Sequence, residues 1–474
     1  MKESIGQGRP QSEIQVASDG DLPVLEAICK HVPLAWIDEA LDRTGSREKR
    51  RRRLPAAAVT WLVLMMGLRS DLDIPAMWRQ VGGVVHEMLE RLDGIKPPTK
   101  SALSQARARL GARPIRQLLL RTGRPMSAGG EAYTHYKGMP MVAMDSDKYK
   151  VPDTPANAKA FGRPTTARGE KVLEGGYPQM HLNRLMTVGT HICIEAIIKP
   201  CNTSDHVTAP KLLEAARPGE LVLWDRGFYS YELMHQARQQ NKFFLGPVPS
   251  HVVLTPIQRL DDGSYLAKIY PSPNDRRDDR GGMLVRVIDY TLDDAALVGC
   301  GECHRLITNL IDPVKYPATE LVVVYHQRWE IEIDNDEITT HQLDRAVELR
   351  SKRPAGVVQE MYGVLVAHNA VRAVMYESAR SIDIDPRRLS FINAVRILRE
   401  TLQTMRDART DRLPMLYQGL IAQIAAARLP PREERINPRV IKVVRPSNFP
   451  VKKPEHRKWP QPKKKFIDSI VMLN

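Results

Sequence analysis

One short stretch, "YHQRWEIEIDNDEITTH" at 325–341, contains five carboxylates and is predicted to form a single helix. The acids are Glu330, Glu332, Asp334, Asp336 and Glu337. Carboxylates at this density either hold a divalent metal ion, because hard cations favour oxygen ligands, or simply face solvent. The phase of the helix helps to separate the two possibilities.

Helical phase divides these acids into two groups. A helix turns by about 100° per residue, which puts Tyr325, Arg328 and Glu332 on one face. Asp336 lies on the same face about one turn further on, so Glu332 and Asp336 are the two candidates for chemistry. We expect a solvated face to hold the other three acids, Glu330, Asp334 and Glu337.

Two further aspartates end predicted strands. "MPMVAMD" at 139–145 is apolar until Asp145, and "LVLWD" at 221–225 is apolar until Asp225. Phosphoryl transfer on a nucleic acid commonly uses two divalent ions about 3.5–4 Å apart, and three carboxylates can hold them. Asp145, Asp225 and one acid of the later helix would supply such a set. Carboxylates at strand ends also cap loops, so spacing alone leaves both interpretations open.

The elements that would position these acids form an α/β pattern from about residue 138 onward. Apolar runs predict strands at 139–145, 179–188, 191–200, 220–225 and 242–249, with helices at 206–216 and 231–241. Gly189-Thr190 would join the second and third strands as a hairpin. This order favours a mixed sheet flanked by helices.

Further segments surround this core. The expected organisation is a flexible N-terminus (1–19), a helical N-terminal DNA-binding domain (20–135), a first core part (136–250), a β-rich insertion with a hairpin at Asp262-Gly263 (251–315), a core helix (316–345), a helical C-terminal region (346–430) and a basic tail (431–474). The tail has twelve Lys or Arg against four Asp or Glu, a composition typical of an extended basic arm.

The charge of the chain points to a polyanionic partner. The 474 residues carry a formal net charge of +15, which favours nucleic acid. In "KSALSQARARL", Arg107 and Arg109 would contact DNA if this helix enters a groove, whereas the alternative is a purely amphipathic helix. No secretory signal is visible, and the apolar run at 55–68 is shorter than the roughly 20 residues that span a bilayer. Five scattered cysteines suit a reducing compartment, so we expect a cytoplasmic protein.

Several segments in succession resemble the motif blocks of bacterial DDE transposases of the insertion-sequence 4 family. They are "VAMDSDKYKVPDTPANAKAFGRP", "YPQMHLNRLMTVGTHICIEA", "LVLWDRGFYSYEL", "VYHQRWEIEIDNDEI" and "ELRSKRP". The N-terminal "RRRRLPAAAVTWLVL" and "KSALSQARARLG" resemble the helical region found in many members.

The resemblance implies an RNase H-like catalytic core interrupted by a β-rich insertion. It also implies Mg²⁺-dependent cleavage of double-stranded DNA at the terminal inverted repeats of a transposon, followed by strand transfer into target DNA. Two Mg²⁺ ions would take part, with Mn²⁺ as a substitute. The family further implies a homodimer in the DNA complex and association with the bacterial nucleoid.

Residue by residue, Asp145 and Asp225 match the first and second catalytic aspartates of the family, which bind the metal. Glu332 matches the catalytic, metal-binding glutamate, and this match selects it over Asp336. Tyr325 and Arg328 match two further signature positions, expected to place DNA phosphate. The last signature position is usually lysine and here is Thr339, whose short neutral hydroxyl lacks the reach of a lysine toward phosphate.

Two other departures bear on activity. Ser146 stands where the family usually has glycine, and its side chain either crowds the metals or has no effect. The insertion holds no tryptophan, so a hairpin intermediate with a flipped base would have to use Tyr265, Tyr270 or Tyr290.

The departure at Thr339 favours one alternative function. This is a catalytically weakened or repurposed transposase that acts as a DNA-binding protein. A second alternative is an RNase H-like structure-specific nuclease, which would cut branched DNA without preferring a terminal repeat.

Overall fold

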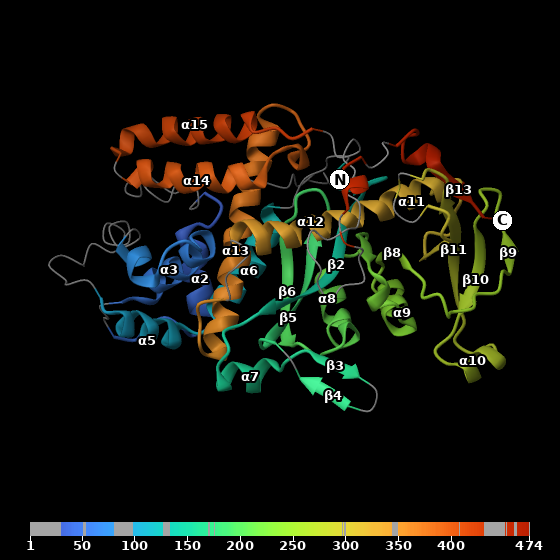
Figure 1. Ribbon diagram of the computed structural model, residues 1–474, viewed down its shortest axis with the longest axis horizontal. Helices are drawn as coiled ribbons and strands as arrows, with labels where there is room; N and C mark the ends of the chain where they lie inside the picture. The colour runs from blue at the N-terminus through green and yellow to red at the C-terminus, as the bar shows by residue number, and fades with distance from the viewer. Residues whose placement is uncertain are drawn as a thin grey trace, which may run out of the picture.

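A computed structural model of the chain has three parts, namely a helical block, a central sheet with helices on both faces, and a β-rich insertion (Figure 1). It describes residues 30–50, 54–79, 98–126, 133–168, 171–174, 176–295, 297, 300–343, 349–406, 408–430, 451, 453–458 and 462–473. The predicted flexible N-terminus at 1–19 and the start of the predicted tail at 431–450 lie outside these residues.

The central sheet has the strand order β6-β5-β2-β7-β8. Its strands are β2 (Met139–Lys150), β5 (Gln179–Thr187), β6 (Cys193–Pro200), β7 (Leu221–Trp224) and β8 (Phe243–Pro247). β2, β5 and β6 pair antiparallel, whereas β7 runs parallel to β2 and β8 runs parallel to β7. Three antiparallel strands followed by two parallel ones form the RNase H-like sheet, so the expected fold class is confirmed.

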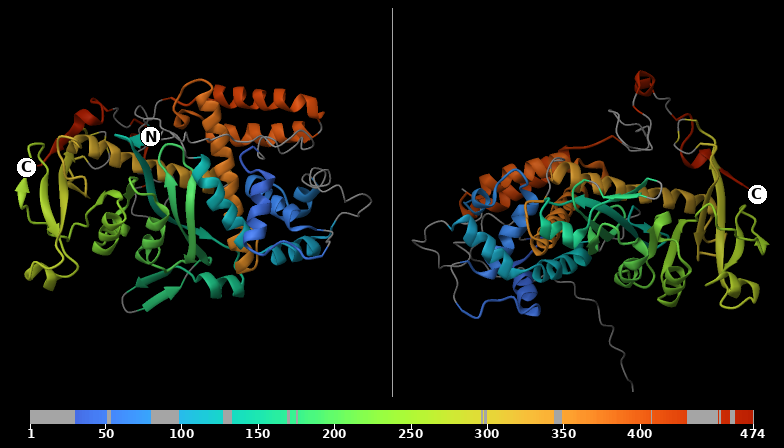
Figure 2. Two further views of the ribbon diagram at one scale, coloured as in Figure 1. Left: turned by 180° about the vertical axis from the view of Figure 1, so that it is seen from behind. Right: turned by 60° about the horizontal axis from the view of Figure 1, so that its bottom comes forward.

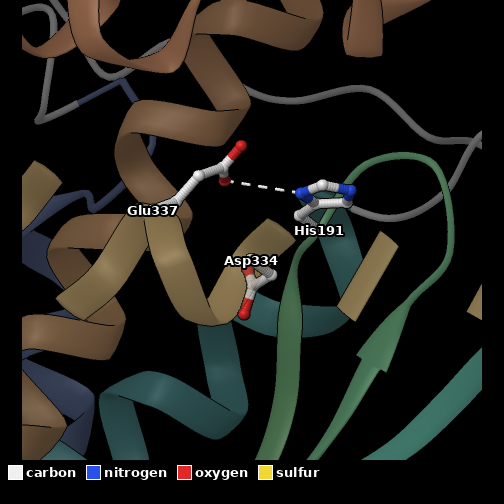
Figure 3. Close-up of side chains that lie close together, drawn as sticks. All are labelled: His191, Asp334 and Glu337. Atoms are coloured by element: carbon white, nitrogen blue, oxygen red, sulfur yellow. Dashed lines mark hydrogen bonds and ion pairs between the residues drawn. The ribbon is translucent and has the colours of Figure 1, made fainter. Parts of the chain in front are cut away.

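The hairpin between β5 and β6 lies at the predicted Gly189-Thr190. Gly189 has a φ of +88°, and a Cβ there would lie 2.4 Å from the carbonyl oxygen of Tyr133. Only glycine fits such a backbone and such a contact. The turn also places His191, which the sequence did not single out, opposite Glu337 of a later helix (Figure 3).

The two faces of the sheet pack against different helices. Val142 and Met144 pack in one cluster with α8 (Ala209–Ala215) and α9 (Tyr231–Gln239). Met141 and Ala143 pack in another with α11 (Ala318–His326). Since successive side chains of a strand alternate between faces, the side chain of residue 145 belongs to the α11 face and that of residue 146 to the α8 face.

β2 continues beyond the predicted strand end at Asp145. It pairs with β5 as far as Lys150, opposite Gln179, and therefore Asp145 lies inside the strand. The expected strand end was wrong because the polar second half of β2 is held by its partner strand, a non-local effect. Only the parallel pairing with β7 stops here, at Met144 opposite Trp224.

The insertion extends the same sheet. Its elements are β9 (Gln258–Arg259), β10 (Tyr265–Ile269), α10 (Pro273–Arg277), β11 (Met283–Leu292) and β12 (His304–Thr308). β12 pairs antiparallel with β8, and β9 and β10 form the hairpin expected at Asp262-Gly263. Near the C-terminus, β13 (Ile470–Met472) pairs with β11, so the end of the predicted extended arm is a strand of the sheet.

The helical block combines segments from both ends of the chain (Figure 2). It contains α2 (Leu34–Arg43), α3 (Ala56–Leu68), α5 (Lys100–Leu110), α6 (Arg113–Met126), α13 (Pro354–Arg380), α14 (Phe391–Arg406) and α15 (Leu413–Ala426), whose buried residues share one cluster. α13 crosses α3 closely, since a Cβ on Gly67 would lie 2.6 Å from the carbonyl oxygen of Gly363. The N-terminal helices thus share their core with the C-terminal ones, and the domain boundaries stay a prediction.

Smaller elements complete the fold. They are β1 (His135–Tyr136), which pairs with β2, then α7 (Pro155–Phe161) and the two-stranded sheet of β3 (Thr165–Arg168) and β4 (Lys171–Glu174). Among the described residues, no helix is both long enough and apolar enough to cross a membrane.

The acidic stretch lies on one broken helix that crosses the α11 face of the sheet. α11 runs into a 3-10 segment (Gln327–Trp329), then α12 (Glu330–Asp336), and then a π-helical turn (Glu337–Gln342). π turns are rare and often occur at functional sites.

Candidate active site

Two of the predicted carboxylates lie side by side where the parallel pairing of β2 with β7 stops. Asp145 and Asp225 directly follow Met144 and Trp224, which are opposite each other in the parallel register of β2 and β7. Asp225 is exposed and caps the turn after β7, where its Oδ1 accepts a hydrogen bond from the backbone NH of Arg226 at 2.6 Å. Parallel pairing therefore brings together two acids that are 80 residues apart in the sequence.

Arg328 joins the third carboxylate to this pair. Its Nη2 lies 3.4 Å from Oε1 of Glu332, whose side chain is 45% exposed, and its guanidinium lies 5.9 Å from the centre of the Tyr325 ring. Burial lowers the pKa of Arg328, but Tyr325 and three carboxylates, those of Asp225, Asp145 and Glu332, outweigh it and raise the pKa overall. The guanidinium thus lies in the field of all three predicted catalytic acids.

Asp145 is the most enclosed of the three. Burial raises its pKa to about 6, although Arg184, Asn335 and Arg328 each lower it. Asn335 Nδ2 donates to Oδ2 of Asp145 at 2.8 Å. Burial also raises the pKa of Tyr325 to about 12, so its hydroxyl stays protonated and able to donate.

These three acids suit a hard divalent ion. Their oxygens are the ligand type that Mg²⁺ prefers, and the exposure of Asp225 and Glu332 leaves room for the waters that Mg²⁺ keeps. Their oxygens do not all lie within 4.8 Å of one another, because the one group of the described residues that meets this limit is a different one, His191, Asp334 and Glu337.

In this second group, Asp334 and Glu337 lie on the buried side of the same helix, and His191 faces Glu337 from the turn between β5 and β6 (Figure 3). Glu330, Asp334 and Glu337 have exposed fractions of 8%, 1% and 4%, so the expectation of a solvated face was wrong. Helical phase separated the two sets of acids correctly. It could not tell which face would meet the protein, because that depends on residues distant in the sequence.

Three cations face the three inner carboxylates. Arg184 Nη1 pairs with Asp334 at 2.5 Å, and Arg372 Nη1 pairs with Glu337 at 3.4 Å. The ring nitrogens of His191 face Glu330 at 3.0 Å and Glu337 at 3.4 Å. His368 Nε2 lies 3.4 Å from Asp334 and 3.3 Å from Glu337, so basic side chains surround the three inner carboxylates.

The inner group does not fit a metal ion. Asp334 and Glu337 already pair with Arg184 and Arg372, and His368 lies within 3.4 Å of both carboxylates, so their oxygens are engaged by protein groups. Burial and Arg372 lower the pKa of His191, but Glu337 and Glu330 outweigh them and raise it overall. The pKa of Glu337 is raised by burial yet lowered well below its usual value by Arg372, His191 and His368.

Two other predicted site residues on this helix, Asp336 and Thr339, already have partners within the protein. Asp336, the rival of Glu332, is 56% exposed and pairs with Nε2 of His341 at 3.3 Å. Thr339 donates its hydroxyl to the backbone carbonyl of Asn335 at 2.7 Å. The hydroxyl at the usual lysine position is therefore already bonded within its own helix.

Ser146 does not crowd the carboxylates. Burial raises the pKa of Asp205, but His181 and the nearby Ser146 hydroxyl lower it overall, which puts the Ser146 side chain close to Asp205. This contact lies on the α8 face, opposite the side chain of Asp145.

The tyrosines of the insertion are mostly buried. Tyr265 and Tyr290 are 4% and 2% exposed, and Tyr290 lies between His304 and His326. Tyr270 is partly exposed and donates to Asp279 at 2.7 Å. Of these three, only Tyr270 could meet a flipped base without first leaving the core.

The two predicted DNA-contacting arginines of α5 also differ in exposure. Arg107 is buried, and its guanidinium donates to Gln359 at 3.0 Å and to Ser351 at 2.9 Å. Arg107 joins α5 to α13 and is not placed to contact phosphate. For this residue the structure favours the alternative of a purely amphipathic helix. Arg109 is exposed, and its contact with DNA stays a prediction.

Arg184, Asn335 and His191 are site residues that the sequence reasoning missed. Asn335 lies three positions after Glu332, a spacing that makes neighbours on a helix surface and could have drawn attention to it. Arg184 and His191 carry no such local signal, because their partners are 150 and 146 residues away.

Comparison with known proteins identifies the family. Residues 23–119 match the insertion element 4 transposase N-terminal family, and residues 136–370 match the transposase DDE domain. The transposase InsG for insertion sequence element IS4 of Escherichia coli K12 is 30% identical over 423 residues, covering 87% of this chain and 91% of that protein. The putative transposase InsZ of the same strain is 28% identical over 230 residues, covering 48% of this chain and 72% of its own.

A solved structure is also similar. The piggyBac transposase, in a synaptic complex with hairpin DNA, aligns with a TM-score of 0.39 and 12% identity over 85% of this chain and 83% of its own. On its identity to the IS4 transposase over nearly the full length of both proteins, the chain belongs to the insertion-sequence 4 family of DDE transposases.

Proposed function

We propose that this DDE transposase cuts DNA at the ends of its transposon in a Mg²⁺-dependent reaction and joins the freed ends to target DNA. The observation that carries the proposal is the parallel register of β2 and β7, which puts Asp145 and Asp225 side by side, together with the contact of Arg328 with Glu332. These three carboxylates match the catalytic positions of the family, and the charges of all three act on Arg328.

In this proposal Asp145, Asp225 and Glu332 hold two Mg²⁺ ions, for which Mn²⁺ would substitute. Such ions, when bound, activate the attacking oxygen and stabilise the leaving oxygen of a phosphoryl transfer. Arg328 donates to a phosphate oxygen and balances part of its charge, and the protonated Tyr325 hydroxyl donates a second hydrogen bond. We further propose that two copies of the chain act on the paired ends.

Cleavage of labelled end DNA by the purified protein in Mg²⁺ tests the assignment. We expect Asp145→Ala and Glu332→Ala to abolish cleavage while end binding persists, because these residues act on the reacting phosphate. Asp336→Ala is the matched control, since it removes an exposed acid about one turn further along the same helix. Normal cleavage by Asp145→Ala or Glu332→Ala would show that the assignment is wrong.

Thr339 supports a second candidate, a transposase of weakened activity that acts mainly by binding DNA. Its hydroxyl is bonded to the carbonyl of Asn335, so it offers phosphate neither charge nor reach. We expect Thr339→Lys to strengthen end binding or raise the cleavage rate, as measured by gel shift and by product formation. Equal binding and cleavage would show that this position is compensated or irrelevant.

A further inference from the structure

Arg184 and Asp145 are direct partners across the sheet. They are opposite each other in the antiparallel register of β2 and β5, so their side chains lie on the same face. Arg184 is 1% exposed, and its guanidinium extends to two consecutive residues of α12, with Nη1 on Asp334 at 2.5 Å and Nη2 on Oδ1 of Asn335. One buried arginine thus ties the strand beside Asp145 to the helix of Glu332.

The arginine also fixes which way the Asn335 amide points. A guanidinium only donates hydrogen bonds, so the amide oxygen of Asn335 must face Arg184. The amide nitrogen then faces Asp145 and donates to Oδ2 at 2.8 Å. A donor held in this way fixes the orientation of the Asp145 carboxylate and leaves it further lone pairs for an ion.

Asn335 also belongs to the helix that carries the third acid. It lies three positions after Glu332, so both side chains lie on neighbouring parts of the α12 surface. The hydrogen bond from Asn335 to Asp145 therefore sets how close the helix, and with it Glu332, comes to the strand. Thr339 donates to the backbone carbonyl of Asn335 one turn further along this helix.

We propose that Asn335, oriented by Arg184, is a positioning residue that sets the spacing and orientation of Asp145 relative to Glu332 before the divalent ion binds. The inference rests on the proposed function, because it takes Asp145 and Glu332 as metal ligands. Hydrogen-bond partners that orient metal ligands typically change metal affinity by about 10–100-fold when removed. Asn335 itself touches no reacting atom.

Titration of the DNA-free protein with Mn²⁺, followed by electron paramagnetic resonance of the free ion, tests the proposal. We expect Asn335→Ala to raise the dissociation constant roughly tenfold or more. Its cleavage rate should fall at low Mn²⁺ and return toward the parent rate as Mn²⁺ is raised, because the ligands are intact and only misplaced. Asn335→Leu, which fills nearly the same volume, carries the test if the alanine variant loses its cooperative unfolding transition.

Two controls separate the possible failures. Asn202→Ala removes an exposed asparagine that bonds the carbonyl of Arg163 at 3.3 Å, and it should bind Mn²⁺ as the parent does. Asp145→Asn should lose most Mn²⁺ binding. If it does and the Asn335 variants bind normally, the positioning role is wrong and the proposed function stands.

Two other results would overturn the positioning role of Asn335. If cleavage by the Asn335 variants stays low at saturating Mn²⁺, their defect is structural and the positioning role is wrong. If Asp145→Asn itself binds Mn²⁺ as the parent does, the proposed function fails, and the role of Asn335 fails with it.

Discussion

The outer and inner faces of α12 carry the same kind of residue in opposite surroundings. On the outer face, Glu332 and Asp336 are 45% and 56% exposed and each has a single charged neighbour among the described ion pairs. On the inner face, three buried acids meet Arg184, Arg372 and His191. Exposed carboxylates with one charged neighbour keep oxygens and space for an ion and its waters, whereas buried carboxylates held by several protein cations act as structural support.

Glu332→Gln and Glu337→Gln make the same chemical change on the two faces. We expect Glu332→Gln to reduce cleavage by about a thousandfold, since losing about 4 kcal/mol of transition-state stabilisation has that effect. Its unfolding free energy should change by less than about 1 kcal/mol, because a single exposed ion pair is worth little. End-DNA cleavage and urea unfolding measure the two quantities, and a variant that cuts well would place the chemistry elsewhere.

Glu337→Gln should show the opposite pattern. The change leaves His191 and Arg372 without their shared carboxylate in a buried site, which typically costs about 3–5 kcal/mol of unfolding free energy. Cleavage per folded molecule should stay near that of the parent at a temperature where the variant is folded. A loss of cleavage without a loss of stability would mean that the inner face takes part in the reaction.

The inner network also predicts a pH dependence of stability. The pKa of His191 is raised in the folded protein above its ordinary value of 6.5. A raised folded pKa means that the stabilisation is fully present below pH 6.5 and is lost as pH rises through the folded pKa. His191→Gln should flatten this part of the curve of unfolding free energy against pH, and an unchanged slope would show that His191 does not titrate there.

Asp336→Asn should have the smallest effect of all. The side chain is exposed and pairs with His341, so its removal should change both cleavage and unfolding free energy little, by less than about 1 kcal/mol. The same two assays apply. A large loss of cleavage would revive Asp336 as the catalytic acid that helical phase alone could not exclude.

Much of the fold followed from local sequence patterns. The strands at 179–188 and 191–200 and the hairpin between them were predicted because apolar runs and a glycine turn are local signals. The end of β2 was misplaced because its polar half is held by pairing with β5, which no local pattern reveals.

The sequence pointed to the exposed acids of the candidate site but not to the buried residues beside them. The family resemblance pointed to Asp145, Asp225 and Glu332, and the register of β2 and β7 puts the first two on neighbouring strands. The burial of Glu337 was missed because its partner His191 comes from a turn 146 residues away. Asn335 was missed because an asparagine becomes informative only once Arg184 is known to orient it.

Anomalous diffraction from crystals grown with Mn²⁺ would test the contrast between the two faces most directly. The account predicts a peak on the outer side of α12, with oxygens of Asp145 and Glu332 as ligands. The inner group of His191, Asp334 and Glu337 should show none, because its charges are already balanced. A Mn²⁺ peak at His191 and Glu337, with none beside Asp145, would contradict the account.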